Sequence, residues 1–221
     1  MVKGNKYRKT LLILNIVSLL VFIFILYCVT SDNYLTVVDQ WVNIHIIEIQ
    51  TPSLTTILAF ITNLSGLVGN SIVAVFVMLF LSYKKWYKER LFYLLSFSGA
   101  VILFAGIKQI VARTRPHSEL IDVINYSFPS GHSTLTMTTS LLVYFIFVRK
   151  LTSSLAKNSL LAVCIAWAIC IAFTRVYLNV HWLSDIVAGL TLGIFWVTFM
   201  RLYFVGVKTP HEKIGTLNLF R

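Results

Sequence analysis

The sequence predicts an all-α, polytopic membrane protein with six transmembrane helices. Hydrophobic residues make up 57% of the 221 residues, and charged residues make up only 12%, against roughly 25% in soluble domains. The mean hydropathy is +0.81. Because a bilayer span needs about 20 mostly apolar residues, the chain has room for about six spans and little else. We therefore expect one integral-membrane domain over residues 1–221.

The spans follow from apolar runs that end at basic residues or turns. The first run is longer than the roughly 7–15 apolar residues of a signal peptide, so we expect it to stay uncleaved. Residues 31–52 carry acidic side chains, Trp41 and an Ile-rich run, which favours a segment on the outer membrane surface. A short interfacial helix is expected before the second span. The six expected spans are residues 10–30, 68–83, 91–111, 132–148, 159–173 and 183–204.

The basic residues orient these spans. Fifteen of the 19 Lys and Arg residues lie before the first span, in residues 84–90 and 149–157, or from residue 201 onward. The positive-inside rule makes that side cytoplasmic and places both termini there. The other four could anchor lipid headgroups, or they could form a functional site, which is the default hypothesis for charges at span ends. These four are Lys108, Arg113, Arg115 and Arg175.

Two other classes of protein are disfavoured by composition. The net charge of +11 does not indicate nucleic-acid binding, because scattered Lys and Arg beside membrane spans give the same total. The three cysteines all lie inside apolar stretches and form no CxxC or Cys/His pattern. We therefore expect neither a disulfide framework nor a structural metal site.

Three polar clusters fall on the expected outer side, each at the end of a different span. The first runs from Lys108 to Arg115-Pro116. The second is the tetrapeptide at residues 129–132, Pro-Ser-Gly-His. The third begins with Thr174-Arg175 and continues to His181 and Asp185. Each cluster alone is a weak signal, but their order and shared membrane side together indicate one functional site.

The cations of these clusters suit a doubly charged oxyanion such as phosphate. Arg115 and Arg175 offer planar bidentate forks, and Lys108 offers a point charge. Gly131 permits a tight turn at the start of the fourth span, where free helix N–H groups bind anions. Ser130 adds a hydroxyl donor. Because Asp185 is the one clearly placed carboxylate, the set is too poor in oxygen ligands for magnesium, and we expect no metal and no other cofactor.

Two histidines complete a reaction centre. His181 and Asp185 are four residues apart, so they share one face if the sixth helix begins by His181. A carboxylate on one ring nitrogen fixes the tautomer and leaves the other nitrogen free to attack. His132 can then protonate the leaving oxygen as a general acid. The pattern predicts nucleophilic transfer of a phosphoryl group.

These clusters resemble the signature of the type 2 phosphatidic acid phosphatase superfamily: Lys, six residues, Arg-Pro; Pro-Ser-Gly-His; and Ser-Arg, five residues, His, three residues, Asp. The match covers residues 108–185, about a third of the chain, and departs at Thr174, where Ser is usual. The resemblance implies a six-helix bundle, a site near the outer leaflet and a phospho-histidine at His181, with Asp185 orienting it and His132 acting as the acid. It implies phosphate binding by Lys108, Arg115, Ser130, Gly131, His132 and Arg175.

We therefore expect a metal-independent membrane lipid phosphatase, acting on the extracytoplasmic side of a bacterial plasma membrane. Its expected substrate is a prenyl diphosphate such as undecaprenyl diphosphate, or a glycerolipid phosphate such as phosphatidylglycerol phosphate or phosphatidic acid. No nucleic acid and no obligate protein partner is expected. Two alternatives stay open: a lipid phosphotransferase that uses the same phospho-histidine, and a non-catalytic transporter or lipid-binding protein. The signature assigns no role to Arg113 or His117.

Overall fold

The computed structural model describes residues 2–31, 35–117, 120–121 and 123–206, and every regular element within them is helical. The all-α prediction is therefore confirmed for this part of the chain. The elements are α1 (Val2–Thr30), α2 (Leu35–Glu48), α3 (Pro52–Asn63), α4 (Leu67–Tyr83), α5 (Tyr87–Val111), α6 (Gly131–Phe147), the short 3-10 helix η1 (Val148–Lys150), α7 (Ser154–Tyr177) and α8 (Leu183–Gly206).

Five of the described helices are long and apolar enough to cross a membrane, namely α1, α5, α6, α7 and α8. The pair α3 and α4 meets at a bend of 44° and passes the same test only when taken together, which brings the number of candidate spans to six. With 17 residues, α4 rises about 25 Å, slightly less than the ~30 Å of a hydrocarbon core. A separate short helix, α3, precedes this span, and its predicted place at the membrane interface stays a prediction.

One helix boundary differs from the prediction in a way that moves functional residues. The fifth span extends to Tyr177, so Thr174 and Arg175 lie in its last turns rather than after it. Helix α7 tolerates these residues because the Thr174 hydroxyl donates back to the Ile171 carbonyl at 2.7 Å. The sixth span begins at Leu183, as predicted, so His181 precedes this helix.

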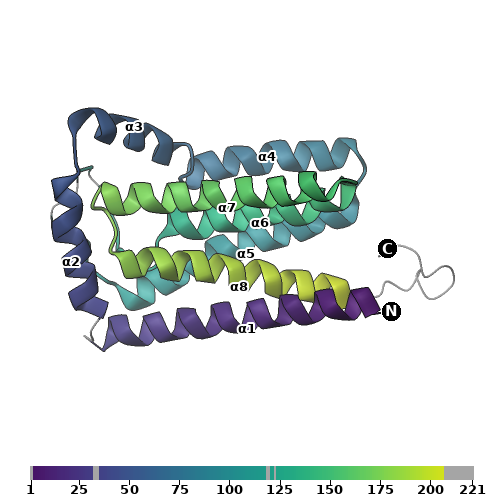
Figure 1. Cartoon of the computed structure of the whole chain (residues 1–221), viewed down its shortest axis with the longest axis horizontal. Coiled ribbons are helices and arrows are strands. Elements are labelled where there is room, and N and C mark those ends of the chain that lie inside the picture. Colours follow the sequence, from purple (N-terminus) through teal and green to yellow (C-terminus); the bar gives the residue numbers. More distant parts are fainter. Residues whose placement is uncertain (1, 32–34, 118–119, 122, 207–221) are drawn as a thin grey trace.

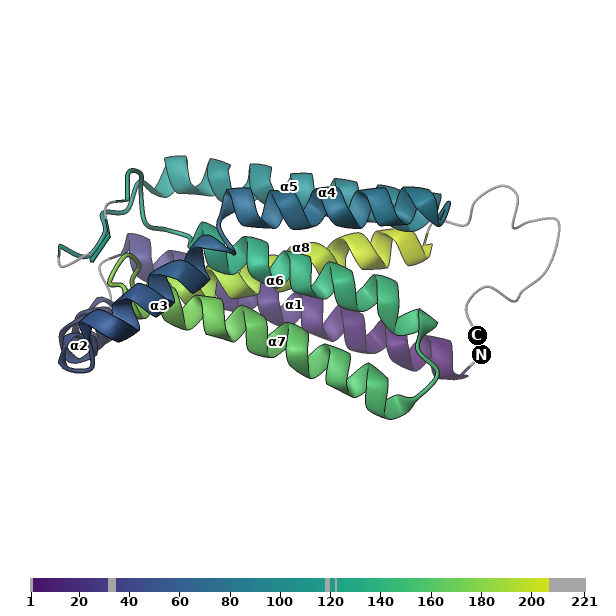
Figure 2. The same cartoon turned by 90° about the horizontal axis from the view of Figure 1, so that it is seen from above.

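Helix α6 is the centre of the bundle and packs against α5, α7 and α8 (Figure 2). Every residue from Ser133 to Leu142 is buried. Helix α1 lies alongside α8 at the edge of the bundle (Figure 1). Large apolar side chains on the outward faces of α1, α4 and α5 are exposed, as expected for helices that contact lipid.

Helix α2 lies across one end of the bundle, where it contacts α1, α7 and α8 (Figure 1). The segment expected on the membrane surface is thus helical over most of its length. The start of α1 and the end of α8 lie together at the opposite end (Figure 1). From residue 207 onward, the expected basic tail falls outside the described residues.

Two glycines four residues apart let α8 approach α6 closely. A Cβ atom on Gly189 would lie 2.6 Å from the Ser130 carbonyl oxygen, and one on Gly193 would lie 2.9 Å from that of Thr134. Small residues at this spacing commonly allow close approach of helices in membranes. The contact brings the first turn of α8 to the start of α6, where the Ser130 N–H donates to the Asp185 carbonyl at 3.1 Å.

This close approach predicts opposite effects for two glycine substitutions. Gly189→Ala should lower the midpoint of thermal unfolding, because overpacking costs about 1–3 kcal/mol. Gly106→Ala is the matched control, since a Cβ atom there meets nothing within 4 Å and alanine is about 1 kcal/mol better than glycine in a helix. Thermal unfolding in detergent, followed by tryptophan fluorescence, measures both. Equal midpoints for the two variants would contradict the packing described.

Candidate active site

His181 lies in the short connection between α7 and α8, with 3% of its surface exposed. Its Nδ1 atom is 3.3 Å from Asp185 Oδ2, and its Nε2 atom is 3.3 Å from Arg115 Nη1. Because α8 begins at Leu183, the start predicted for the sixth span, His181 precedes the helix and the two residues do not share a helix face. The predicted His–Asp pair forms nevertheless, between the connection and the first turn of α8.

The connection is shaped by local backbone contacts. Asn179 has a φ of 55°, in the left-handed region that asparagine tolerates better than most residues. The Leu178 N–H donates to the Thr174 carbonyl at 2.9 Å and ends α7. The Trp182 N–H donates to Asp185 Oδ2 at 3.0 Å. One carboxylate therefore both starts α8 and faces the imidazole.

Asp185 is fully buried, and its two oxygens have different partners. Oδ1 accepts from Arg113 Nη1 at 2.6 Å, while Oδ2 faces His181 Nδ1 and the Trp182 N–H. A buried carboxylate needs such partners, because an unpaired buried charge is costly. With the guanidinium on one oxygen, the other oxygen can accept the Nδ1–H of His181 and leave Nε2 with a free lone pair.

The pKa of His181 lies well below its usual value. Burial is the largest cause, and the positive charges of Arg175, Arg115 and Lys108 lower the pKa further. At neutral pH the imidazole is therefore uncharged, which is the form that can attack as a nucleophile.

Two of the predicted cations lie side by side against backbone carbonyls. Lys108 Nζ and Arg115 Nη2 both donate to the Tyr126 carbonyl, at 2.8 Å and 3.1 Å. Arg115 also donates from Nε to the Asn125 carbonyl at 2.8 Å and from Nη1 to the Val180 carbonyl. Backbone carbonyls therefore hold the two side chains in place next to each other.

Arg175 approaches the site from α7 and is only 2% exposed. Its Nη1 donates to the hydroxyl of Thr62 on α3 at 3.1 Å. Its Nε is buried and has no hydrogen-bond partner among the described residues. A charged donor left unpaired in a buried site is unfavourable, and an anion would satisfy it.

The start of α6 adds backbone donors. Ser130 caps the helix, and its hydroxyl oxygen accepts from the Ser133 N–H at 3.4 Å. The N–H groups of Gly131 and His132 belong to the first turn, where no intrahelical acceptor exists. The charges of Arg175, Lys108 and Arg115 act on the His132 ring, and a Cβ atom on Gly66 would lie 3.1 Å from its Nε2. The imidazole is thus packed against the break between α3 and α4.

The predicted site residues therefore gather at one end of the bundle, around His181. Among the described residues, no group of three or more His, Cys, Asp or Glu side chains could hold a metal ion. The groups available to a phosphate here are the cations and the helix N–H groups. The gathered residues are Lys108, Arg115, Ser130, Gly131, His132, Arg175, His181 and Asp185.

Sequence reasoning missed the role of Arg113. Its side chain is 14% exposed, so the interpretation of this residue as a headgroup anchor is wrong. Besides Asp185, it binds the Ser184 hydroxyl at 2.7 Å and Asp39 Oδ2 at 2.7 Å. Its guanidinium lies 5.5 Å from the Trp182 ring centroid. Arg113 thus joins the carboxylates of Asp39 on α2 and Asp185 on α8. His117, the other residue without a role in the signature, is exposed.

Asp39 on α2 is the second residue that was missed. It is 2% exposed, and its Oδ1 and Oδ2 atoms accept from the N–H and hydroxyl of Ser184 at 2.9 Å and 2.5 Å. One turn later, Asn43 donates to the Asn179 side chain at 2.6 Å. The sequence did contain a signal for this role, because Asp39 and Asn43 are four residues apart in a mostly apolar segment and so share one helix face. Helix α2 therefore bonds to the chain on both sides of His181, to Asn179 before it and to Ser184 after it.

Comparisons with known proteins find a consistent family. Residues 89–208 match the family model of the PAP2 superfamily. Phosphatidylglycerophosphatase B of Bacillus subtilis is 30% identical over 90% of this chain and 95% of its own. An undecaprenyl-diphosphatase of Sulfolobus acidocaldarius is 29% identical over 62% of this chain and 64% of its own. A lipid A 4'-phosphatase of Porphyromonas gingivalis is 30% identical over 56% of each chain.

One solved structure shares the fold. The crystal structure of a transmembrane PAP2 type phosphatidylglycerolphosphate phosphatase from Bacillus subtilis aligns with a TM-score of 0.77. The alignment covers 92% of this chain and 98% of that chain at 24% identity. The arrangement of helices described above is therefore that of a known membrane fold.

The contact between Arg113 and Asp39 predicts energetic coupling between the two residues. Arg113→Gln and Asp39→Asn should each lower the free energy of unfolding, and the double variant should lose less than the two losses combined. Contacting charged residues typically couple by about 0.5–3 kcal/mol. Unfolding in mixed detergent micelles measures all four proteins.

The matched control replaces Arg90, at the opposite end of α5, by glutamine. Its loss should add to that of Asp39→Asn, because distant sites are independent. If the coupling energy between Arg113 and Asp39 is near zero, as expected for Arg90 and Asp39, the Arg113–Asp39 contact contributes nothing to stability.

Proposed function

The chain belongs to the PAP2 superfamily of membrane lipid phosphatases, and from this membership we propose that it removes a terminal phosphate from a lipid phosphate through a phospho-histidine at His181. The observation that carries the proposal is the buried His181 imidazole, with Nδ1 facing Asp185 and Nε2 beside Arg115. A neutral ring in that setting has its free nitrogen next to a group that binds phosphate.

In the proposed first step, the terminal phosphate binds among the cations. Lys108, Arg115 and Arg175 neutralise its negative oxygens, and the N–H groups at the start of α6 add further donors. Charge stabilisation of this kind supplies most of the catalysis in phosphoryl transfer. The buried Nε of Arg175 gains the acceptor that it otherwise lacks.

The second step transfers the phosphoryl group. His181 Nε2 forms a bond to phosphorus while the bond from phosphorus to the lipid oxygen breaks. The leaving oxygen takes a proton from His132, and the Nδ1–H of His181 stays hydrogen-bonded to Asp185, which stabilises the charge that develops on the ring. Asp185 is a catalytic residue through this contact with the nucleophile.

The third step restores the enzyme. His132, now neutral, takes a proton from a water molecule, and the water oxygen bonds to phosphorus as the bond to His181 Nε2 breaks. Inorganic phosphate leaves, and His132 holds the proton needed for the next cycle. General acid–base catalysis of this kind contributes about 10²–10⁴-fold in rate.

We place the site on the extracytoplasmic side of a bacterial plasma membrane. The support is the charge distribution: the basic loops after α4 and after α6 lie at the same end as the start of α1, opposite α2 (Figure 1). The positive-inside rule assigns that end to the cytoplasm, and with it both termini. The site then faces the outer leaflet.

The proposed substrates follow from the relatives. One relative is a phosphatidylglycerophosphatase and another an undecaprenyl-diphosphatase, so both phosphatidylglycerol phosphate and undecaprenyl diphosphate are candidates, with phosphatidic acid as a third. All three present a terminal phosphate on a lipid. We rank undecaprenyl diphosphate first.

The first test is phosphate release by the purified protein in detergent, with the three candidate lipids side by side. Release should continue in excess EDTA, because cations rather than a metal hold the phosphate, and His181→Ala should abolish it. His45→Ala, a change at an exposed histidine on α2, should retain the activity. Release that needs added magnesium, or that survives in His181→Ala, would refute the mechanism.

The second test concerns the orientation of His181. Asp185→Asn keeps the shape but loses the negative charge, so kcat should fall by about 100-fold or more while KM changes little. Asp39→Asn is the matched control and should have a smaller effect, because Asp39 acts on Asp185 only through Arg113 and Ser184. Equal kcat values for Asp185→Asn and the unmodified enzyme would make the His–Asp pair merely structural.

A further inference from the structure

We propose that Arg113 is a positioning residue for the phosphoryl transfer, and that helix α2 holds it in that role through Asp39. This inference rests on the proposed function, because it concerns how the His181–Asp185 pair of that reaction is oriented. Arg113 follows α5, whereas α2 lies across the end of the bundle, outside the three clusters of the signature (Figure 1).

The donors of Arg113 are directed at carboxylates rather than at the phosphate site. Its Nη1 donates to Asp185 Oδ1 at 2.6 Å, and its Nη2 donates to Asp39 Oδ2 at 2.7 Å. Both carboxylates are buried, so they balance the charge of the guanidinium within the protein. Arg115, two residues later, instead donates to backbone carbonyls and lies beside His181 Nε2. Arg113 therefore acts on Asp185 and not on the phosphate.

The contact with Arg113 fixes the rotation of the Asp185 carboxylate. The terminal torsion of an aspartate side chain is broad, with two roughly equivalent orientations. Here Oδ1 is held by Arg113 and Oδ2 by the Trp182 N–H at 3.0 Å, so that Oδ2 faces His181 Nδ1 at 3.3 Å. Without Arg113, Oδ1 loses its guanidinium partner and the carboxylate rotates more freely. The imidazole is then oriented less accurately.

Asp39 fixes the guanidinium relative to the first turn of α8. Its Oδ1 accepts from the Ser184 N–H at 2.9 Å, and its Oδ2 accepts from both the Ser184 hydroxyl and Arg113. Ser184 immediately precedes Asp185 in the chain. The Arg113 guanidinium also lies 5.5 Å from the Trp182 ring centroid. One carboxylate of α2 therefore holds Arg113 and the start of α8 in a single hydrogen-bonded unit.

Helix α2 also holds the chain on the other side of the nucleophile. Asn43 donates from Nδ2 to Asn179 Oδ1 at 2.6 Å. Asn179, two residues before His181, is in the left-handed region with a φ of 55°. Just beyond α2, Gln50 donates to the Tyr177 carbonyl at 2.7 Å. The connection between α7 and α8 is thus bonded to this part of the chain at both ends, and α2 sets the position of the imidazole.

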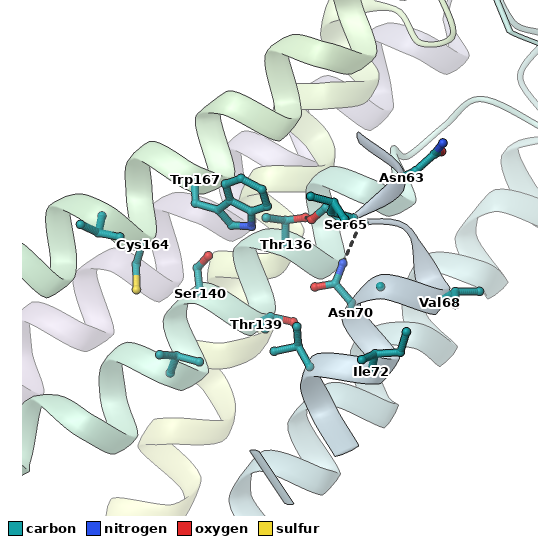
Figure 3. A pocket seen from close by; sticks show the side chains of 15 residues that line it. Asn63, Ser65, Val68, Asn70, Ile72, Thr136, Thr139, Ser140, Cys164 and Trp167 are labelled. Carbon is teal, nitrogen blue, oxygen red and sulfur yellow. Dashed lines mark hydrogen bonds between the residues drawn. The ribbon is translucent and has the colours of Figure 1, made fainter. Parts of the chain in front are cut away.

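The phosphate-binding side of the site has supports of its own. Arg175 Nη1 donates to the hydroxyl of Thr62 near the end of α3 at 3.1 Å. The break after α3 is tied to α6, because the hydroxyls of Ser65 and Thr136 are 2.5 Å apart. It is tied to α4 by Asn70 Nδ2, which donates to the Ser65 carbonyl at 2.6 Å, the contact drawn in Figure 3. Changes at the α2 contacts should therefore affect the nucleophile more than phosphate binding.

The pH dependence of the reaction distinguishes positioning from stability. Arg113 offsets the negative charge of Asp185, and that negative charge favours a protonated His181. Arg113→Gln should therefore raise the pKa of His181, whereas a loss of folded protein changes no pKa. The other charged or titratable groups around this pair stay in place in the variant, namely Asp39 from α2, Lys108 from α5, Arg115 after it, His132 from α6 and Arg175 from α7.

The test compares purified variants with the unmodified enzyme on one lipid phosphate. Arg113→Gln should lower kcat about tenfold or more, because small misplacements of reacting groups are costly. The inhibition constant of inorganic phosphate should stay within about twofold, because ground-state binding is retained. The acidic limb of kcat/KM, which reports the free enzyme, should move to higher pH. Asp39→Asn and Asn43→Ala should lower kcat by less and should not move that limb upward.

Two matched controls accompany these variants. Arg90→Gln removes the same charge at the opposite end of α5, and Gln40→Ala removes an exposed amide of α2. Both should keep the kcat and the pH profile of the unmodified enzyme. Thermal unfolding in detergent reports how much of each variant is folded, so that kcat is compared per folded protein.

An unchanged kcat in Arg113→Gln would overturn the proposal, and so would a lower kcat with an unmoved pH profile. Loss of phosphate inhibition would also overturn it, because Arg113 would then be a phosphate ligand. In each of these outcomes the unmodified enzyme still releases phosphate in a His181-dependent reaction, so the proposed function stands.

Where Arg113→Gln does not fold, Arg113→Lys takes its place. This variant keeps the charge, but a single ammonium lacks the planar fork that bonds both carboxylates. Its kcat should fall while the acidic limb stays where it is. An unchanged kcat in Arg113→Lys would then overturn the proposal.

Discussion

The fully buried carboxylate of Asp185 is the constraint on which the site depends. Such a charge is stable only with close partners. Its partners come from two parts of the chain: Arg113 after α5, and the connection before α8, which supplies His181 and the Trp182 N–H. The hydrogen bonds of the Asp185 carboxylate therefore fix the start of α8, the orientation of the His181 imidazole and the position of the segment that follows α5. Through Arg113 the same requirement extends to Asp39 on α2.

A second constraint relates this pair to the phosphate-binding groups. Gly189 lets α8 approach the start of α6 so closely that the Ser130 N–H reaches the Asp185 carbonyl. The backbone of one residue thus joins the helix N-terminus that can bind an anion to the helix that carries the orienting carboxylate. In the proposed mechanism, helix packing therefore sets the position of Asp185, which orients His181, relative to the phosphate, and positions fixed by packed helices are more precise than positions on loops.

The sequence was sufficient for the features that depend on local patterns. Apolar runs predicted the helical spans, including the start of the sixth at Leu183 but not the extension of the fifth to Tyr177, and the spacing from His181 to Asp185 predicted their contact. It was insufficient for Asp39, which is 74 residues from Arg113 in the chain. Its burial follows from the way α2 crosses the bundle end, which no local periodicity encodes. The close approach at Gly189 is likewise a property of two helices.

In the proposed mechanism, the cations around His181 have two effects that reinforce each other. Their charge favours a bound phosphate. Burial is the largest cause of the lowered pKa of His181, and the same positive charges lower that pKa further, so that the ring is neutral before the substrate arrives. A site with fewer cations would bind phosphate less well and would also hold more of its nucleophile in the protonated, unreactive form. Once a phosphate neutralises the cations, Asp185 still stabilises the positive charge that develops on the imidazole as it attacks. The positive charge of these residues therefore contributes both to phosphate binding and to the neutral state of the nucleophile.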